Sequence, residues 1–292
     1  MAKALDSAAG DPREAALFAF LNSQPVANLP NDLNLISPQQ LGSFHATGTA
    51  QGNTQIASLS GRMANIQAGS TGFSSAGFAV NGSAPSFGEG FAGVSGAEGK
   101  SGPAVFAPTP ENRWGVFVTG VGEFTNVGNT PNATGYDVHT GGFTTGVDYR
   151  VTPFLAVGLT AGYAHSTVNL NAGGDIDVNS GKFGVYATAF SQGFYLDTAV
   201  SGGPSGYSSQ RAALQGNASG STNGGDFDFL VAAGYDWKVG GLTIGPIASF
   251  QLSYIGINGF TESGSLAPLK FPDQNFESER TGFGEKWRMT GK

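Results

Sequence analysis

The sequence predicts an all-β fold: an antiparallel transmembrane β-barrel, incomplete with about seven or eight strands present, preceded by an α-helix and a linker. Three observations lead to this fold class. Period-two alternation begins near Arg113, aromatic residues lie at the ends of the alternating segments, and short connections alternate with long ones. No stretch approaches the ~20 apolar residues of a membrane-spanning helix, so any membrane crossing is assigned to strands.

The composition excludes several classes of function. Only 12% of the residues are charged, about half of the share in an average soluble domain. The net charge of -7 argues against a nucleic-acid partner, because phosphate-binding surfaces need clustered Lys and Arg. The chain has no cysteine, which excludes disulfide bonds and thiolate metal sites.

The first predicted element is a helix in an N-terminal helical segment, residues 1–68. Ser37 is a suitable N-cap and Pro38 suits the first helical position. Apolar residues then recur at roughly helical spacing, and small residues keep the helix slim enough for a narrow channel. The apolar residues are Leu41, Phe44, Ile56, Leu59, Met63 and Ile66, and the small ones are Gly48, Ala50, Gly52 and Ala57. A surface helix of a small N-terminal subdomain is the alternative.

Residues 69–110 are rich in Gly, Ser, Ala and Pro without a sustained period, so we interpret them as a linker. The barrel domain is assigned to residues 111–292. Its first segment, around Trp114, is the least clearly sided. Six further segments each have one apolar face, at 143–151, 155–163, 183–189, 194–200, 227–237 and 242–254.

Aromatic residues lie near the ends of the apolar faces, where the interfacial girdles of membrane barrels belong. The candidates are Tyr149, Tyr163, Tyr235, Trp237 and Tyr254. Connections 150–153, 191–193 and 238–241 are tight, whereas 128–135, 169–181, 202–225 and 258–277 are long and rich in Gly, Asn and Ser. Because membrane barrels have short periplasmic turns and long outer loops, this order predicts that the preceding helix ends on the periplasmic side and threads the lumen.

The small or polar face of the segments carries the charges that we expect in the lumen. They are Glu123, Asp148, Arg150, Lys182, Asp197, Asp226, Asp228 and Asp236. Two interpretations remain open: these charges hold the helix or shape a channel, or they pair among themselves in a solvated lumen.

Neither a metal site nor a catalytic site is expected. His45, His139 and His165 are too scattered for ligand spacing. The pairs Asp175/Asp177 and Asp226/Asp228 share a strand face simply because i and i+2 do. We therefore expect no enzyme and no cofactor, and keep a surface enzyme on a barrel scaffold as a minor alternative.

Several motifs together resemble the translocator domain of type V secretion autotransporters. They are Leu-Asn-Leu-Ile-Ser-Pro-Gln-Gln at 33–40, a Gly/Ser linker, then Trp-Gly-Val-Phe-Val-Thr-Gly at 114–120, Phe-Thr-Thr-Gly-Val-Asp-Tyr at 143–149, Val-Gly-Leu-Thr-Ala-Gly-Tyr at 157–163 and Gly-Tyr-Asp-Trp-Lys at 234–238. The resemblance spans most of the chain. It implies a bacterial outer-membrane location, a helix that plugs the barrel, and partners that are membrane lipid, the barrel-assembly machinery and an exported passenger. It also makes Asn53 and Asn65 possible sites of passenger cleavage.

Several features depart from that family. No passenger and no signal peptide precede the helix, the strands are fewer than the dozen that close the family's barrel, and a terminal aromatic residue is missing. We therefore expect a truncated, non-functional copy. Residues 277–292 show no apolar face, so we expect no lipid-facing strand there. We hypothesise a frameshift just before Trp287, because the last six residues can be written in codons that, shifted by one nucleotide, read Val-Ala-Tyr-Asp-Trp-Lys.

The predicted function is that of a translocator that enables export or surface display of a passenger. The alternative is a small, complete eight-stranded barrel acting as a structural protein or adhesin. That alternative needs a working eighth strand, which the charged C-terminal segment does not offer.

Overall fold

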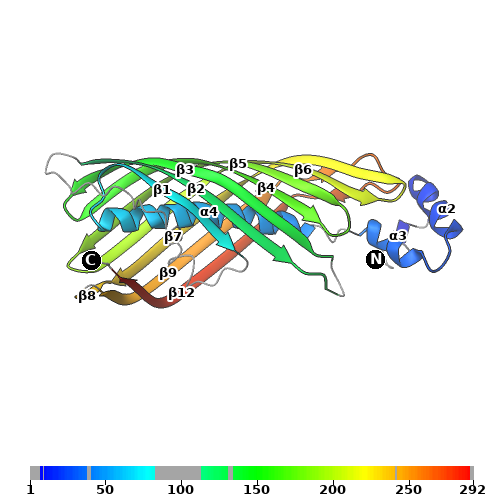
Figure 1. The fold of residues 1–292 in the computed structure, drawn as a ribbon. Helices are drawn as coiled ribbons and strands as arrows, with labels where there is room; N and C mark the ends of the chain where they lie inside the picture. Colours follow the sequence, from blue (N-terminus) through cyan, green and yellow to red (C-terminus); the bar gives the residue numbers. More distant parts are fainter. Residues whose placement is uncertain are drawn as a thin grey trace.

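The computed structural model describes residues 7–8, 10–37, 41–82, 113–130, 134–240 and 242–289. A short 3-10 helix η1 (Pro12–Glu14) and helices α2 (Ala15–Ser23) and α3 (Leu29–Leu35) precede the long helix α4 (Leu41–Gln67). Helices α2 and α3 lie beyond one end of the sheet, whereas α4 runs inside it (Figure 1). Of the helices in the described ranges, none is both long and apolar enough to cross a membrane.

The rest of the described chain is almost entirely β-strand. The strands are β1 (Gly72–Gly82), β2 (Trp114–Val127), β3 (Tyr136–Thr152), β4 (Leu155–Leu170), β5 (Gly174–Ser191), β6 (Phe194–Ala213), β7 (Gly216–Tyr235), β8 (Trp237–Val239), β9 (Leu242–Ile257), β10 (Phe260–Thr261), β11 (Lys270–Phe271) and β12 (Gln274–Met289). Many of the long strands exceed the length usual in soluble sheets, as tilted membrane strands do.

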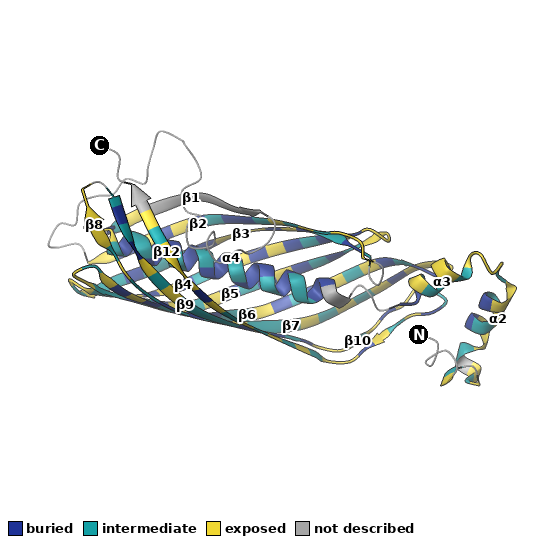
Figure 2. Ribbon diagram, turned by 90° about the horizontal axis from the view of Figure 1, so that it is seen from below, coloured by how far each residue is buried: buried dark blue, intermediate teal, exposed yellow. Residues whose placement is uncertain are grey.

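One sheet holds all long strands in the order β1-β2-β3-β4-β5-β6-β7-β9-β12, with β8 pairing with β9 at the side. Every pairing from β2 to β12 is antiparallel. The sheet curves around α4 (Figures 1 and 2). Among the described strands no pairing joins β12 to β1, so the wall is open there. The structure is thus an incomplete antiparallel barrel around a helix.

The linker expected over residues 69–110 begins with a strand instead. Strand β1 pairs in parallel with β2, for example Phe73 with Val116. The first strand of an open wall offers a row of unpaired backbone groups, and β1 satisfies them. The rest of the expected linker, from 83 to 110, lies outside the described residues.

The outward face of each long strand changes character along its length. On β4 the outward residues Leu155, Val157, Leu159, Ala161 and Tyr163 are apolar, whereas His165, Thr167 and Asn169 beyond them are polar. The inward face changes in the opposite sense, since Val168 and Leu170 are buried there. The apolar face therefore switches from outside to inside just beyond Tyr163, which marks the outer edge of the lipid-facing band.

Two connections were predicted wrongly as long loops. Residues 169–181 and 202–225 lie almost wholly in strands, and the actual turns are 171–173 and 214–215. These segments lack outward apolar residues because they project beyond the lipid-facing band. Their buried apolar side chains, Leu170, Ile176, Val178 and Tyr207, instead join a core within the projecting part. The other members of this core are Phe44, Val138, Val168, Ile255 and Ile257.

Residues 277–292, for which the sequence predicted no lipid-facing strand, do form a strand as far as residue 289. Strand β12 pairs with β9 over its whole length, from Gln274 opposite Ile257 to Met289 opposite Leu242. A strand forms because the β9 ladder supplies its hydrogen bonds and its inner face suits the interior. Its outward face carries the exposed Glu277, Glu279 and Glu285, which the sequence placed on one side.

Candidate functional site

The candidate site is the contact between α4 and the inner face of the sheet. In the half of the helix toward its C-terminus, Leu59 and Met63 have no exposed surface. They belong to a cluster with wall residues from several strands: Ile56, Leu59, Met63, Ile66, Phe117, Ala156, Tyr186, Ala199 and Leu230. At the other end of the helix, the ring of Phe44 lies 5.7 Å from that of Tyr207. The predicted apolar residues from Phe44 to Ile66 therefore pack on the wall, and the surface-helix alternative is wrong.

Small residues set how closely the helix approaches the wall. A Cβ atom on Gly48 would lie 2.8 Å from the Ile255 side chain, and one on Gly52 would lie 2.4 Å from Asp228 Oδ1. Both distances are below van der Waals contact. Gly48 and Gly52 therefore have a physical role at this interface that their sequence spacing only suggested.

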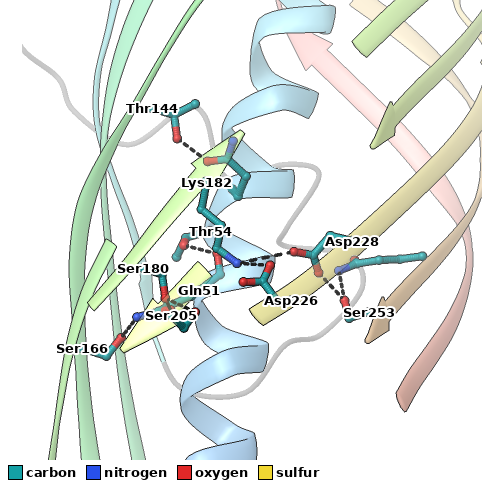
Figure 3. A network of polar contacts seen from close by, with 12 residues as sticks. Gln51, Thr54, Thr144, Ser166, Ser180, Lys182, Ser205, Asp226, Asp228 and Ser253 are labelled. Carbon is teal, nitrogen blue, oxygen red and sulfur yellow. Dashed lines mark hydrogen bonds and ion pairs between the residues drawn. The ribbon is translucent and has the colours of Figure 1, made fainter. Parts of the chain in front are cut away.

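Two glutamines of α4 bind polar groups of the wall (Figure 3). Gln51 Nε2 donates to Ser166 Oγ at 2.9 Å, and Ser180 Oγ donates to Gln51 Oε1. One turn further on, Gln55 Oε1 accepts a hydrogen bond from Thr144 Oγ1 at 2.7 Å. All five side chains are buried. Buried polar groups without partners are costly, so these bonds favour one position of the helix.

A second polar group, formed by Lys182, Asp226, Asp228 and Ser253, lies on the wall (Figure 3), and its Asp228 faces Gly52. Lys182 Nζ of β5 donates to Asp226 and lies 3.7 Å from Asp228 Oδ2, both on β7. Ser253 Oγ of β9 donates to Asp228 Oδ1 at 2.7 Å. The predicted lumen residues Lys182, Asp226 and Asp228 therefore pair among themselves, across the strand β6 that lies between β5 and β7.

Arg62 is the charged anchor of the helix. Its Nε donates to Asp148 Oδ2 at 2.7 Å and its Nη2 to Asp148 Oδ1 at 3.0 Å. The hydroxyl of Tyr186 donates to the same carboxylate at 2.8 Å, and the Arg62 guanidinium lies over the Phe117 ring at 5.4 Å. A bidentate, desolvated pair of this kind is sensitive to the loss of either partner.

The C-terminal end of α4 is held near the tight turns. Gln67 Nε2 donates to Asp197 Oδ1 at 2.7 Å and to Thr188 Oγ1 at 3.0 Å. Arg150 Nη2 donates to the carbonyl of Ile66 at 2.9 Å, which satisfies an acceptor at the helix terminus. The helix therefore begins at the end of the projecting strands and finishes at the end with the tight turns.

The remaining predicted lumen residues do not contact α4 through a described hydrogen bond or ion pair. Glu123 accepts a hydrogen bond from Thr125 at 3.4 Å, and Asp236 lies 3.4 Å from Lys286 Nζ of β12. Prediction from sequence missed the helix partners Gln51, Gln55 and Arg62. A usable signal was present, because Arg62 is the only Lys, Arg, Asp or Glu in the 27 residues of α4.

The predicted girdle residues lie on the outer face at two levels. Tyr149, Tyr235 and Trp237 lie near the tight turns, where the Tyr149 ring is 4.9 Å from the ring of Trp114. Tyr163 and Tyr254 lie near the outer edge of the apolar band, and their hydroxyls donate to Asn179 and Asn275. Tyr163 is in the middle of β4, because that strand continues beyond the band.

The N-terminal helices pack on the outer turns. Leu17 and Leu21 of α2 and Ile36 share a buried cluster with Leu214 of the β6–β7 turn and Ala267. The neighbouring Arg211 forms a buried ion pair with Glu262 and donates to the carbonyl of Leu35 at 2.5 Å. These contacts attach the N-terminal helices to the projecting ends of β6 and β7.

The strands present apolar residues outward and surround a helix, and comparison with known proteins identifies the family that has this arrangement. A family model for the autotransporter beta-domain matches residues 116–290. The chain belongs to the autotransporter beta-domain family. This membership places the chain in the outer membrane of Gram-negative bacteria.

The autotransporter fold is also found in the solved structures. The chain is similar to the translocator domain of the autotransporter NalP from Neisseria meningitidis, with a TM-score of 0.53 and 16% sequence identity. The match covers 60% of this chain and 62% of the NalP domain, so this autotransporter chain spans less than two thirds of that domain. No curated protein sequence matches the chain significantly.

Proposed function

We propose that this autotransporter domain is a translocator, through which a passenger polypeptide reaches the cell surface, and that α4 plugs the wall once the passenger has passed. One observation carries the proposal: α4 fills the interior from the projecting end, where Phe44 packs, to the tight-turn end, where Gln67 is bound. A chain in this orientation runs from outside the cell, through the lumen that the wall surrounds, to the periplasmic side.

The proposal assigns roles to the predicted segments and charges. Residues 1–68 join the passenger to the barrel and plug its lumen. Residues 69–110 connect this plug to the wall, and residues 111–292 form the wall. Asp148, Arg150 and Asp197 hold the plug, since they contact Arg62, Ile66 and Gln67. Lys182, Asp226 and Asp228 pair with one another on the wall. The role is transport rather than catalysis.

The proposed partners follow from the same arrangement. Outer-membrane lipid covers the outward band, whose aromatic residues lie at both edges. The barrel-assembly machinery inserts the strands, and a passenger polypeptide uses the path now occupied by α4. The net charge of -7 leaves nucleic acid without a binding surface.

Surface exposure of the N-terminal end tests the translocator role. The chain is expressed in a Gram-negative host behind an export signal and an epitope tag, and intact cells are treated with protease. We expect loss of the tag together with a heat-modifiable gel shift, because the barrel folds and α4 begins outside. A matched chain carries the tag at Gln192, in the tight turn between β5 and β6, where it should stay protected. Protection of the N-terminal tag in a folded barrel would contradict the proposal.

A further inference from the structure

One face of α4 meets the wall residues Lys182, Asp226 and Asp228, and the side chains on this face have an unusual order of sizes. Phe44, Gly48, Gly52 and Ile56 follow one another at four-residue spacing, so they lie on one face, a turn apart. Phe44 and Ile56 are both 4% exposed, and each packs in a different apolar cluster. Two positions without side chains therefore lie between two large anchors.

The wall opposite these glycines is rigid. Gly52 faces Asp228, which is 1% exposed and tied through Ser253 to β9 and through Lys182 to β5. Gly48 faces Ile255, which is 2% exposed within the core of the projecting part. Asp226 Oδ1 and Asp228 Oδ2 have no hydrogen-bond partner among the described residues, so the wall meets the helix backbone here without a polar side chain of the helix between them. A side chain added at Gly52 would displace a buried carboxylate that has nowhere to move.

Both one-turn displacements of α4 place a large side chain in this gap. Moving the helix outward by four residues, about 6 Å, brings Ile56 opposite Asp228. Moving it inward by the same step brings Phe44 opposite Ile255. The native position is the one in which glycines occupy both places.

We propose that Gly48 and Gly52, together with Asp228, Lys182 and Ile255 of the wall, form a register stop that halts α4 at one position in the lumen. In the translocator role, on which this inference rests, the stop ends movement of the chain when the two glycines reach the wall cluster. Gly48 and Gly52 are positioning residues, and only in this register do Gln51 and Gln55 both meet the wall residues that bind them, since a shift of one turn leaves one of the two wall sites without a glutamine.

Disulfide cross-linking tests the register directly, because the chain has no cysteine of its own. The pair Gln51→Cys with Ser180→Cys reports the native register, since these side chains are hydrogen-bonded. The pairs Thr47→Cys with Ser180→Cys and Gln55→Cys with Ser180→Cys report the two one-turn displacements. We expect Gly52→Val to lower the native cross-link severalfold and to raise one of the displaced ones. Ala57→Val, on a half-buried face of the same helix, should leave the native cross-link dominant.

Rescue keeps the test decisive if Gly52→Val prevents folding. Asp228→Gly removes the carboxylate that the new side chain would meet, so the double variant should regain both the heat-modifiable fold and the native cross-link. A native cross-link in Gly52→Val at the unsubstituted level would overturn the register stop, and so would a double variant that fails to regain it. A chain cross-linked in the native register whose N-terminal tag stays protected would contradict the translocator role alone.

Discussion

The buried pair between Arg62 and Asp148 is the single contact whose loss should cost most. Arg62→Met leaves the Asp148 carboxylate buried at 5% exposure without its bidentate partner. We expect a loss of about 3–5 kcal/mol, because an uncompensated buried charge keeps its full desolvation cost. Urea titration of the heat-modifiable form in micelles measures it. Lys238→Met, at an exposed position near the tight turns, is the control and should change little.

A double variant separates the charge from the packing. Arg62→Met with Asp148→Leu should recover part of the lost stability, since neither charge then remains buried alone. If Arg62→Met by itself matches the unsubstituted chain, the pair does not stabilise the seated helix.

Gly158 is predicted to be irreplaceable because it faces the ring of Tyr186. A Cβ atom at this position would lie 2.3 Å from Cζ of that ring, and the ring is held by the hydrogen bond from its hydroxyl to Asp148. Gly158→Ala should therefore destabilise the barrel by about 1–3 kcal/mol through overpacking. Gly141→Ala on β3 is the matched control, because a Cβ there meets nothing within 4 Å. Equal unfolding midpoints for the two variants would show that the ring can move aside.

For single residues, the sequence predicted which face of a strand each side chain lies on but not which residue it contacts. Period-two alternation placed Asp148, Lys182 and Asp228 on the inner face because successive strand side chains point in opposite directions. It could not pair Asp148 with Arg62, since the two residues are 86 positions apart and the sequence carries no local signal of their contact. The same holds for Gln51 and Ser180, whose contact depends on how far the helix slides into the sheet.

Among the elements, β4 and β5 are the clearest case of a pattern that changes meaning along a strand. Alternation with apolar residues outward ends at Tyr163, and the polar outward residues that follow were interpreted as loop. The same strands continue with Val168, Ile176 and Val178 facing inward. A reversal of phase, rather than an end of strand, therefore marks where a barrel strand leaves the bilayer. The seven strands β2 to β7 and β9 were predictable because their lipid-facing halves alternate with period two, whereas β1 and β12 were missed. The inward helix was predictable from its small residues and from the order of short and long connections.

The projecting core predicts an asymmetry between the two faces of these strands. Ile176→Ala removes a side chain that is 1% exposed and should cost roughly 2–5 kcal/mol, as truncations of buried aliphatic residues do. Ser208→Ala, on the exposed outer face of β6, should stay within about 0.5 kcal/mol. Unfolding midpoints in micelles give both values. A large loss of stability for Ser208→Ala with none for Ile176→Ala would contradict this prediction, because it would mean that the buried face of these strands is the one that carries Ser208.

For the whole molecule, β12 shows where the bilayer lies relative to the wall. Its outward residues pair with those of β9, so Glu277 is level with Tyr254 and Trp287 is level with Ile244, which pairs with Trp237. Ten residues of tilted strand separate these levels, about 25 Å of height, which is the thickness of the apolar band. Glu277 is thus at the outer interface, whereas Glu279 and Glu285 lie inside the band. No other described strand presents an acidic side chain outward within it.

Replacing these glutamates should therefore stabilise the inserted protein in a depth-dependent order. Glu279→Leu and Glu285→Leu should each gain on the order of 1 kcal/mol in lipid vesicles, because a carboxylate facing hydrocarbon is costly and the cost falls toward the interfaces. Glu277→Leu, at the level of Tyr254, is the matched control and should gain least. Reversible urea unfolding from vesicles measures all three. Equal gains at all three positions would mean that this face of β12 does not contact the bilayer, since only a lipid-facing strand makes the cost of a carboxylate depend on its depth.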